Sequence, residues 1–209
     1  MKKKLKKIEL SDRPLIEKKL QSTRFLCCEY SFQNLFIWAS VYDTRWAIEN
    51  DILYLLYAEE NSLLMPIPEP PLNKLIEIPE KFNLDKNSLH ISHVEEDYIK
   101  SNPDVHDHFE VVNDENFIDY VHLIERLVEL KGTKLAKKKN LISQFTRNNP
   151  EYQCLKISPQ IKNECLNFAE YWLSKQNENH IGLEHEYLAL QSAFTEVASK
   201  KMKILIANH

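Results

Sequence analysis

The sequence predicts a mixed α/β protein in which helices flank a β-sheet. Runs rich in β-branched and aromatic residues alternate along the chain with segments whose apolar residues recur at helical spacing. Of the 209 residues, 43% are hydrophobic and 28% are charged, which is typical of a globular chain. A turn pair between two apolar runs predicts a hairpin. Together these observations favour an α/β or α+β fold.

Two helices are expected near the start of the chain. Pro14 fits the first turn of a helix that continues to residue 20, because proline lacks an N–H that this position does not need. Ser31 is a plausible N-cap for a second helix over residues 32–38, whose apolar residues share one face.

The next segment predicts a hairpin followed by a third strand. Residues 45–49 and 52–58 surround the turn pair Asn50–Asp51, and a further run covers residues 61–65. Four prolines lie between residues 66 and 71. Because proline cannot donate a hydrogen bond to a neighbouring strand, we expect the chain to leave the sheet at Pro66.

The rest of the chain alternates helices and strands. We expect a helix over 72–82 that Pro79 interrupts, and then strands at 89–94 and 109–112 with a polar loop between them. A helix from Leu123 stops at Gly132, and a basic helix over 134–147 follows it. Next we expect a strand at 152–157, a helix that opens at Ser158–Pro159, a helix over 184–200 and a strand at 202–207. The apolar run at residues 204–206 suits a strand buried on both faces. It is either the last strand of a sheet or the point at which a larger domain was cut.

Composition excludes several classes of function. With only Gly132 and Gly182, the chain cannot build a glycine-rich phosphate loop, so no cofactor is expected in this chain. A net charge of −4 argues against a nucleic-acid binder. The four cysteines have no C-x-x-C spacing and indicate free thiols in the cytoplasm, and no apolar run is long enough to span a membrane.

The basic helix is the strongest candidate for a binding site. When its residues are placed at about 100° per step, Lys138 falls on the side that carries the apolar residues. Snorkelling or a structural ion pair explains a lysine there, and so does an anionic ligand such as phosphate. The candidate ligand-binding residues are Lys134, Lys137, Lys138, Lys139 and Asn140.

Other polar clusters point to no chemistry. His90, His93, His106 and His108 are best explained as parts of solvated polar segments, so we predict no metal site. The carboxylates around His185 favour the start of a helix and need no catalytic role. No spacing of cysteine and histidine indicates a thiol enzyme, and no catalytic residue can be assigned.

Two stretches resemble a known bacterial family. The first covers residues 29–38, Tyr42 and residues 45–51; the second is the pattern Leu-x-x-Leu-x-Gly-x-Lys-Leu-x-Lys-Lys-Lys-Asn-x-x-x-x-Phe over residues 127–145. Together they are similar to the family related to the C-terminal region of phosphatidylglycerol lysyltransferase. This resemblance implies two tandem acetyltransferase-like (GNAT) folds and acyl or aminoacyl transfer. The family usually has Lys-Arg-Asn where this chain has Lys138-Lys139-Asn140.

The resemblance also leads to expectations about organisation. We expect a first GNAT-like domain over residues 1–182 and the start of a second, incomplete one over 183–209, so that this chain is a truncated or non-catalytic relative. A complete protein would use acyl-CoA or aminoacyl-tRNA, the latter being the one nucleic-acid partner expected. The alternatives are a transferase completed by homodimerisation through the incomplete C-terminal fold, and a protein-interaction module.

Overall fold

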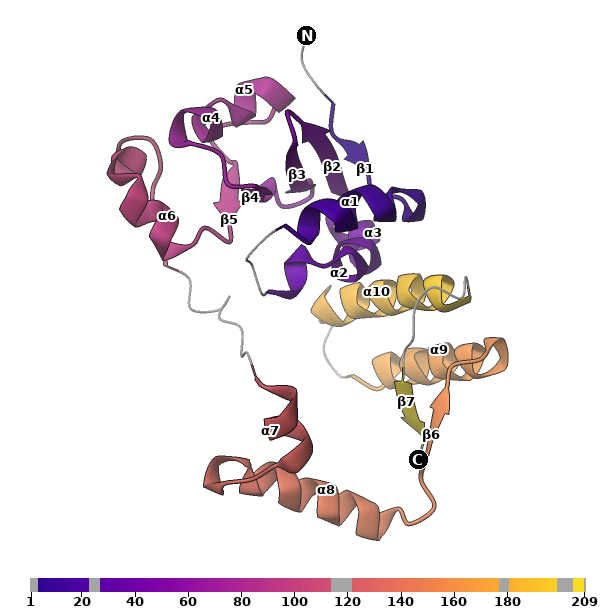
Figure 1. Cartoon of the computed structure of the whole chain (residues 1–209). Helices are drawn as coiled ribbons and strands as arrows, with labels where there is room; N and C mark the ends of the chain where they lie inside the picture. Colours follow the sequence, from indigo (N-terminus) through magenta and orange to yellow (C-terminus); the bar gives the residue numbers. More distant parts are fainter. Residues whose placement is uncertain (1–3, 23–26, 114–121, 177–180, 199–204, 209) are drawn as a thin grey trace. The chain divides into compact units, whose positions relative to one another are not determined.

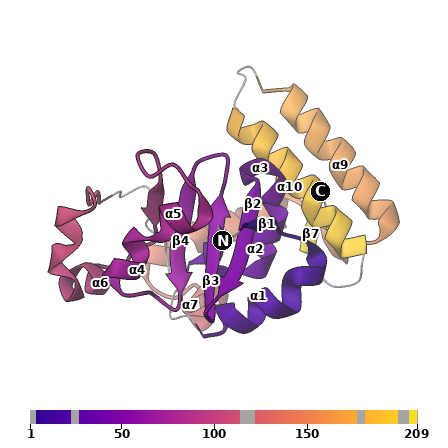
Figure 2. The same cartoon turned by 90° about the horizontal axis from the view of Figure 1, so that it is seen from above.

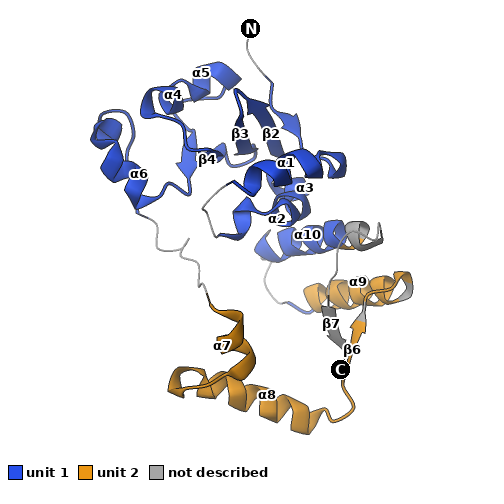
Figure 3. Ribbon diagram, viewed as in Figure 1, with its two compact units in different colours: residues 1–114, 175–193 blue, residues 115–174, 194–209 orange. Residues whose placement is uncertain are grey.

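The chain folds into two compact units, each described below by itself (Figures 1 and 3). The computed structural model describes residues 4–22, 27–113, 122–176, 181–198 and 205–208. Unit 1 comprises residues 1–114 and 175–193, and unit 2 comprises residues 115–174 and 194–209. Because these units are defined by contacts, the division into acetyltransferase-like repeats at residue 182 stays a prediction.

Unit 1 is built on a five-stranded mixed sheet. Its strands follow each other in chain order: β1 (Lys6–Lys7), β2 (Thr44–Glu49), β3 (Ile52–Tyr57), β4 (Ser62–Ile67) and β5 (His90–Ser92). Neighbours from β1 to β4 are antiparallel, whereas β4 and β5 are parallel. This sheet and its flanking helices confirm the predicted mixed α/β class.

Helices cover both faces of this sheet (Figure 2). One face carries the 3₁₀ helix η1 (Leu10–Asp12), α1 (Arg13–Leu20), the 3₁₀ helix η2 (Cys28–Tyr30), α2 (Phe32–Ile37) and α3 (Ala39–Tyr42). The other carries α4 (Leu72–Ile76), α5 (Ile78–Phe82) and α6 (Glu96–Ser101), and the 3₁₀ helix η3 (Pro103–Asp107) follows α6 along the chain. Residues of β3 alternate between the two cores, with Leu53 and Leu55 on the first face and Tyr54 and Leu56 on the second.

Local sequence signals set several of these elements. Ser31 Oγ accepts a hydrogen bond from the Asn34 amide 3.2 Å away, which confirms it as the N-cap of α2. Asn50 and Asp51 both have positive φ, 48° and 67°, as a two-residue turn between twisted strands requires. The predicted hairpin is therefore present, with the predicted residues in its turn.

The expectation that the chain leaves the sheet at Pro66 is wrong. β4 continues to Ile67, which pairs with Leu53, while Leu64 pairs with Leu55. Met65 and Pro66 therefore stand opposite the single residue Tyr54, and this bulge accommodates a residue that cannot donate to the ladder. The bulge also keeps Ile67 on the same face of the sheet as Leu64.

A second correction concerns residues 95–112. The segment expected to be a polar loop contains α6 and η3, which bury Tyr98 and Val105. Residues 109–112 form no strand, and Val112 is 73% exposed. Their strand propensity has no effect because no neighbouring strand pairs with them in the described part of the chain.

Unit 2 contains mainly helices in its described residues. They are α7 (Ile124–Glu129), the 3₁₀ helix η5 (Thr133–Leu135), α8 (Ala136–Asn148) and α9 (Pro159–Ser174), with an antiparallel pair formed by β6 (Gln153–Lys156) and β7 (Leu205–Asn208). Leu130, at φ 47°, takes the left-handed position after α7 that was expected at Gly132. The remaining helix, α10 (Ile181–Ala198), belongs to unit 1 up to Ala193.

Candidate functional site

The predicted lysine cluster lies at the start of α8. Lys134 is in η5, and Lys137, Lys138, Lys139 and Asn140 follow in the first turns of the helix. All five side chains are exposed. Within the part of the chain that the structure describes, none of the four lysines forms an ion pair.

Lys138 lies on the side of α8 that carries the apolar residues, but that side is not buried as expected. Leu141 and Ile142, which share its side of α8, are more than half exposed, and no residue of α8 is buried. Lys138 therefore does not need to reach past an apolar contact to meet water. Its ammonium group is accessible to a ligand. This exposure is compatible with the predicted anion site but does not test it.

The position of these lysines in the helix is electrostatically unfavourable. The first turn of α8 contains no acidic residue, although a helix N-terminus carries partial positive charge and favours anions. Lys137 and Lys138 add full positive charges to that end. An anion bound there would interact favourably with both the lysines and the helix dipole.

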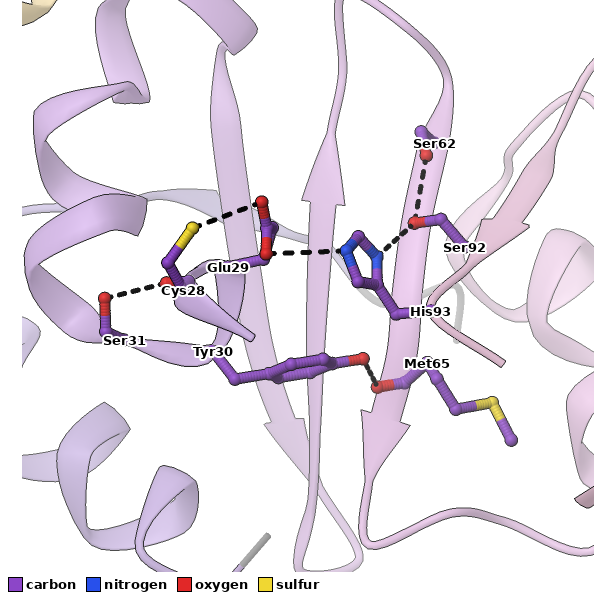
Figure 4. A network of polar contacts seen from close by, with 8 residues as sticks. All are labelled: Cys28, Glu29, Tyr30, Ser31, Ser62, Met65, Ser92 and His93. Atoms are coloured by element: carbon purple, nitrogen blue, oxygen red, sulfur yellow. Dashed lines mark hydrogen bonds and ion pairs between the residues drawn. The ribbon is translucent and has the colours of Figure 1, made fainter. Parts of the chain in front are cut away.

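The structure also brings together a polar cluster in unit 1 that sequence reasoning missed; Figure 4 shows two of its members, Glu29 and His93, with their surroundings. Cys27 directly precedes η2, Glu29 lies within it, and His93 follows the last residue of β5 with φ 59°. One ligand atom from each of these three side chains lies within 4.8 Å of the others. His93 Nε2 lies 3.6 Å from a carboxylate oxygen of Glu29.

Tyr30 and two serines support this cluster from the sheet. The buried Tyr30 hydroxyl donates to the Met65 carbonyl oxygen in β4 at 2.9 Å, and its ring meets His93 edge-on at 5.8 Å between centroids. On the other side of the imidazole, Nδ1 lies 3.1 Å from Ser92 Oγ, to which Ser62 Oγ donates at 3.4 Å. Burial raises the pKa of Tyr30 far above its usual value, so the hydroxyl stays protonated.

The other candidate residues of the sequence do not join a site. His90, His106 and His108 are exposed, and only His93 of the four histidines enters the cluster. Glu184 lies in the first turn of α10, as expected for a carboxylate that favours the helix dipole.

Sequence spacing could not have revealed the cluster. The parallel pairing of β4 with β5 places Ser92, the neighbour of His93, opposite Leu64. The hydrogen bond from Tyr30 to the carbonyl oxygen of the next residue, Met65, holds η2 and with it Cys27 near the same point. The one local signal is that Glu29 and Tyr30 begin the stretch on which the family resemblance was based.

The fold defines the chain as a mixed α/β protein with a helix-flanked sheet. Comparison with known proteins also identifies its family. The family described as phosphatidylglycerol lysyltransferase, C-terminal, matches residues 23–209. The chain therefore belongs to this family, as its sequence resemblance predicted.

A solved structure is similar over nearly the whole chain. It is a conserved protein of unknown function from Bacteroides thetaiotaomicron VPI-5482, 26% identical, with a TM-score of 0.83 over 98% of this chain and 71% of that one. No curated protein matches the chain. In the part of the chain that the structure describes, no helix combines the length and the apolar character needed to cross a membrane.

Proposed function

We propose that this chain is a GNAT-like relative of acyl and aminoacyl transferases that binds an anionic group through the lysine cluster of α8. The cluster consists of Lys134, Lys137, Lys138, Lys139 and Asn140. The observation that carries the proposal is that the four lysines are exposed and form no ion pair with an acidic residue in the described chain, within a motif that the family resemblance singled out. Family membership supports a transferase-related role.

The chemistry of the cluster favours a phosphate-bearing ligand. Lysine ammonium groups bind phosphate oxygens, and the positive end of a helix dipole favours them. Acyl-CoA and aminoacyl-tRNA, the two donors that the resemblance implies, both carry phosphates. Because the chain lacks a glycine-rich loop, side chains rather than a backbone cradle would have to supply most of the contacts.

The test is a comparison of Lys138→Met with Lys86→Met. Both lysines are exposed and form no ion pair among the described residues, but Lys86 lies in unit 1, away from α8 in sequence. Binding of acetyl-CoA and of aminoacyl-tRNA is measured by titration at low and at moderate salt. We expect Lys138→Met to raise the Kd about tenfold or more, equivalent to about 1.4 kcal/mol, and Lys86→Met to leave it unchanged. Equal binding by both variants would refute the proposal.

A specific observation favours a second candidate, a transferase completed by a second copy of the chain. α7 exposes a row of large apolar side chains: Ile124 is 74% and Val128 is 77% exposed, with Leu123 and Leu127 beside them. Exposed apolar groups of this kind mark interaction surfaces.

The second candidate is tested by mass measurement in solution. Light scattering should then find a dimer for the unmodified chain and a monomer for Val128→Lys, while Glu125→Lys on the same helix should remain dimeric. A strictly monomeric unmodified protein would exclude this candidate and leave anion binding by the single chain.

A further inference from the structure

Three side chains of the types that bind metal ions converge at the edge of the unit 1 sheet, on the side of η2. Cys27 offers Sγ, Glu29 a carboxylate oxygen and His93 a ring nitrogen, all within 4.8 Å of one another. All three are partly buried rather than exposed. Their elements are fixed by the sheet: η2 through the hydrogen bond from Tyr30 to Met65, and His93 through the pairing of β5 with β4.

The hydrogen bonds of the imidazole distinguish a metal site from a thiol nucleophile activated by histidine. Ser92 Oγ accepts from Ser62 Oγ and can accept a second hydrogen bond from His93 Nδ1–H. In that tautomer the lone pair of Nε2 points toward the Glu29 carboxylate, 3.6 Å away. Two acceptors face each other, and either a proton or a metal ion between them would stabilise the arrangement.

A thiol nucleophile would require a different arrangement. In a nucleophile–base–carboxylate relay, the carboxylate binds the ring nitrogen opposite to the one that activates the nucleophile. Here Glu29 lies on the Nε2 side and a serine hydroxyl lies on the Nδ1 side. The cluster is therefore arranged for convergence on one point rather than for a relay.

The geometry points to a zinc site formed by Cys27 Sγ, a carboxylate oxygen of Glu29 and Nε2 of His93, with water in the fourth position. Around a tetrahedral zinc ion with ligands at about 2.0–2.3 Å, neighbouring ligand atoms lie roughly 3.3–3.8 Å apart. The distance of 3.6 Å between His93 Nε2 and the Glu29 carboxylate oxygen already fits this spacing. The distances from Cys27 Sγ are at most 4.8 Å, so rotation of the side chains would have to shorten them by about 1 Å or less.

Charge and ligand type favour zinc over other ions. A thiolate and a carboxylate together balance the two positive charges of the ion, and Glu29 pairs with no lysine or arginine among the described residues. Sulfur and imidazole ligands disfavour magnesium and calcium, which bind oxygen. Ser92 is the positioning residue, because a metal-binding histidine is oriented by a hydrogen bond at its other nitrogen. The proposed zinc site shares no residue with the lysine cluster of α8.

The test compares Cys27→Ser with its neighbour Cys28→Ser in the full chain. Cys28 is exposed and donates to the other carboxylate oxygen of Glu29 at 3.4 Å, so it is a matched cysteine outside the proposed ligand set. Chelator-treated protein is titrated with zinc chloride by calorimetry, and with cobalt chloride to detect thiolate-to-cobalt absorption. We expect one zinc per chain and a sulfur–cobalt band for the unmodified protein and for Cys28→Ser. In Cys27→Ser the band should be lost and the zinc affinity lowered at least about tenfold.

Two further variants keep the proposal falsifiable if a ligand substitution disturbs the fold. Ser92→Ala should weaken zinc binding roughly 10–100-fold while its circular dichroism stays that of the unmodified protein. Tyr30→Phe keeps the ring beside His93 but removes the hydrogen bond that fixes η2 to Met65, so it should weaken zinc binding as well. Failure of the unmodified chain to bind zinc, or equal zinc binding and an equal cobalt spectrum in Cys27→Ser, would overturn the proposal in favour of a metal-free ion pair between Glu29 and His93.

Discussion

Asp12 is a buried carboxylate that ties the first turn of the chain to the sheet. It accepts hydrogen bonds from Lys6 Nζ at 2.6 Å, from the Glu9 amide at 2.9 Å and from Trp46 Nε1 at 2.9 Å, and it is only 5% exposed. Lys6 also lies over the Trp46 ring at 4.4 Å. Removing the carboxylate would leave the buried Trp46 indole N–H and the partly buried Glu9 amide without this acceptor.

Asp12→Ala should therefore lower the free energy of unfolding by about 1–3 kcal/mol, because the Trp46 N–H would be buried without an acceptor and one such donor costs about 1–3 kcal/mol. The measurement is urea denaturation followed by Trp fluorescence. Asp12→Asn, which keeps one acceptor oxygen, should lose less. A change within about 0.5 kcal/mol for Asp12→Ala would show that water satisfies these donors.

The same residue predicts a pH dependence. Burial alone would raise the pKa of Asp12, but the hydrogen bonds from Lys6, Glu9 and Trp46 outweigh it and hold the pKa below the ordinary value. A carboxyl group with a lowered pKa in the folded state stabilises the protein above its unfolded-state pKa of about 4, and that stability is lost as the pH falls further. The stability difference between the unmodified protein and Asp12→Asn should thus be constant near neutrality and shrink below about pH 4. An unchanged difference at acid pH would contradict the lowered pKa.

At the scale of elements, the hairpin turn between β2 and β3 offers a test of backbone conformation. Asn50 is exposed and has φ 48°, a region that asparagine tolerates and alanine does not. Asn50→Ala should destabilise the protein by about 1–2 kcal/mol, while Asn50→Gly should be neutral or slightly stabilising. Thermal unfolding of the two variants provides the comparison, and equal melting temperatures would show that the turn can change type at no cost.

Elements with a local chemical signal could be predicted from the sequence. Ser31 caps the helix that it was expected to cap, and a helix opens at Ser158–Pro159 as expected; in both cases the serine hydroxyl accepts from an amide three residues later. Asn50–Asp51 forms the predicted turn. These outcomes depend on atoms within a few residues of each other, which is the range that spacing rules describe.

Elements that depend on distant partners could not be predicted. Pro66 stays in the sheet because a bulge opposite Tyr54 relieves its missing donor, and residues 109–112 stay out because nothing in the described chain pairs with them. The cluster of Cys27 and His93 has the same cause, since it follows from which strands become neighbours. The lysine cluster of α8 could be located from sequence because it is local, but its exposure could not.

At the scale of the whole molecule, stability should be unevenly distributed. Unit 1 has apolar cores on both sides of its sheet, whereas the described residues of α7 and α8 include none that is buried. Local opening requires less free energy where few apolar contacts are lost.

Hydrogen exchange measured by mass spectrometry should therefore separate the two regions. Peptides from β3 and β4 should exchange slowest, by several orders of magnitude relative to those from α7 and α8, because opening the sheet requires most of the global unfolding free energy. Similar protection in α7 and β3 would show that the exposed apolar surface of α7 is covered in solution, which is the outcome expected of the dimer candidate.

The return of the chain to unit 1 through α10 affects the order in which the protein can fold during synthesis. Residues 1–114 leave the ribosome first, but residues 175–193 of the same unit follow only after all of residues 115–174 have been made. The contact between Ser40 Oγ and Ser192 Oγ, 3.4 Å apart, joins the early part to the late one. At about 5–20 residues per second, this leaves an interval on the order of seconds in which the surface that later meets α10 stays uncovered. A nascent chain halted after residue 114 would present that surface to chaperones, whereas one released after residue 193 would not.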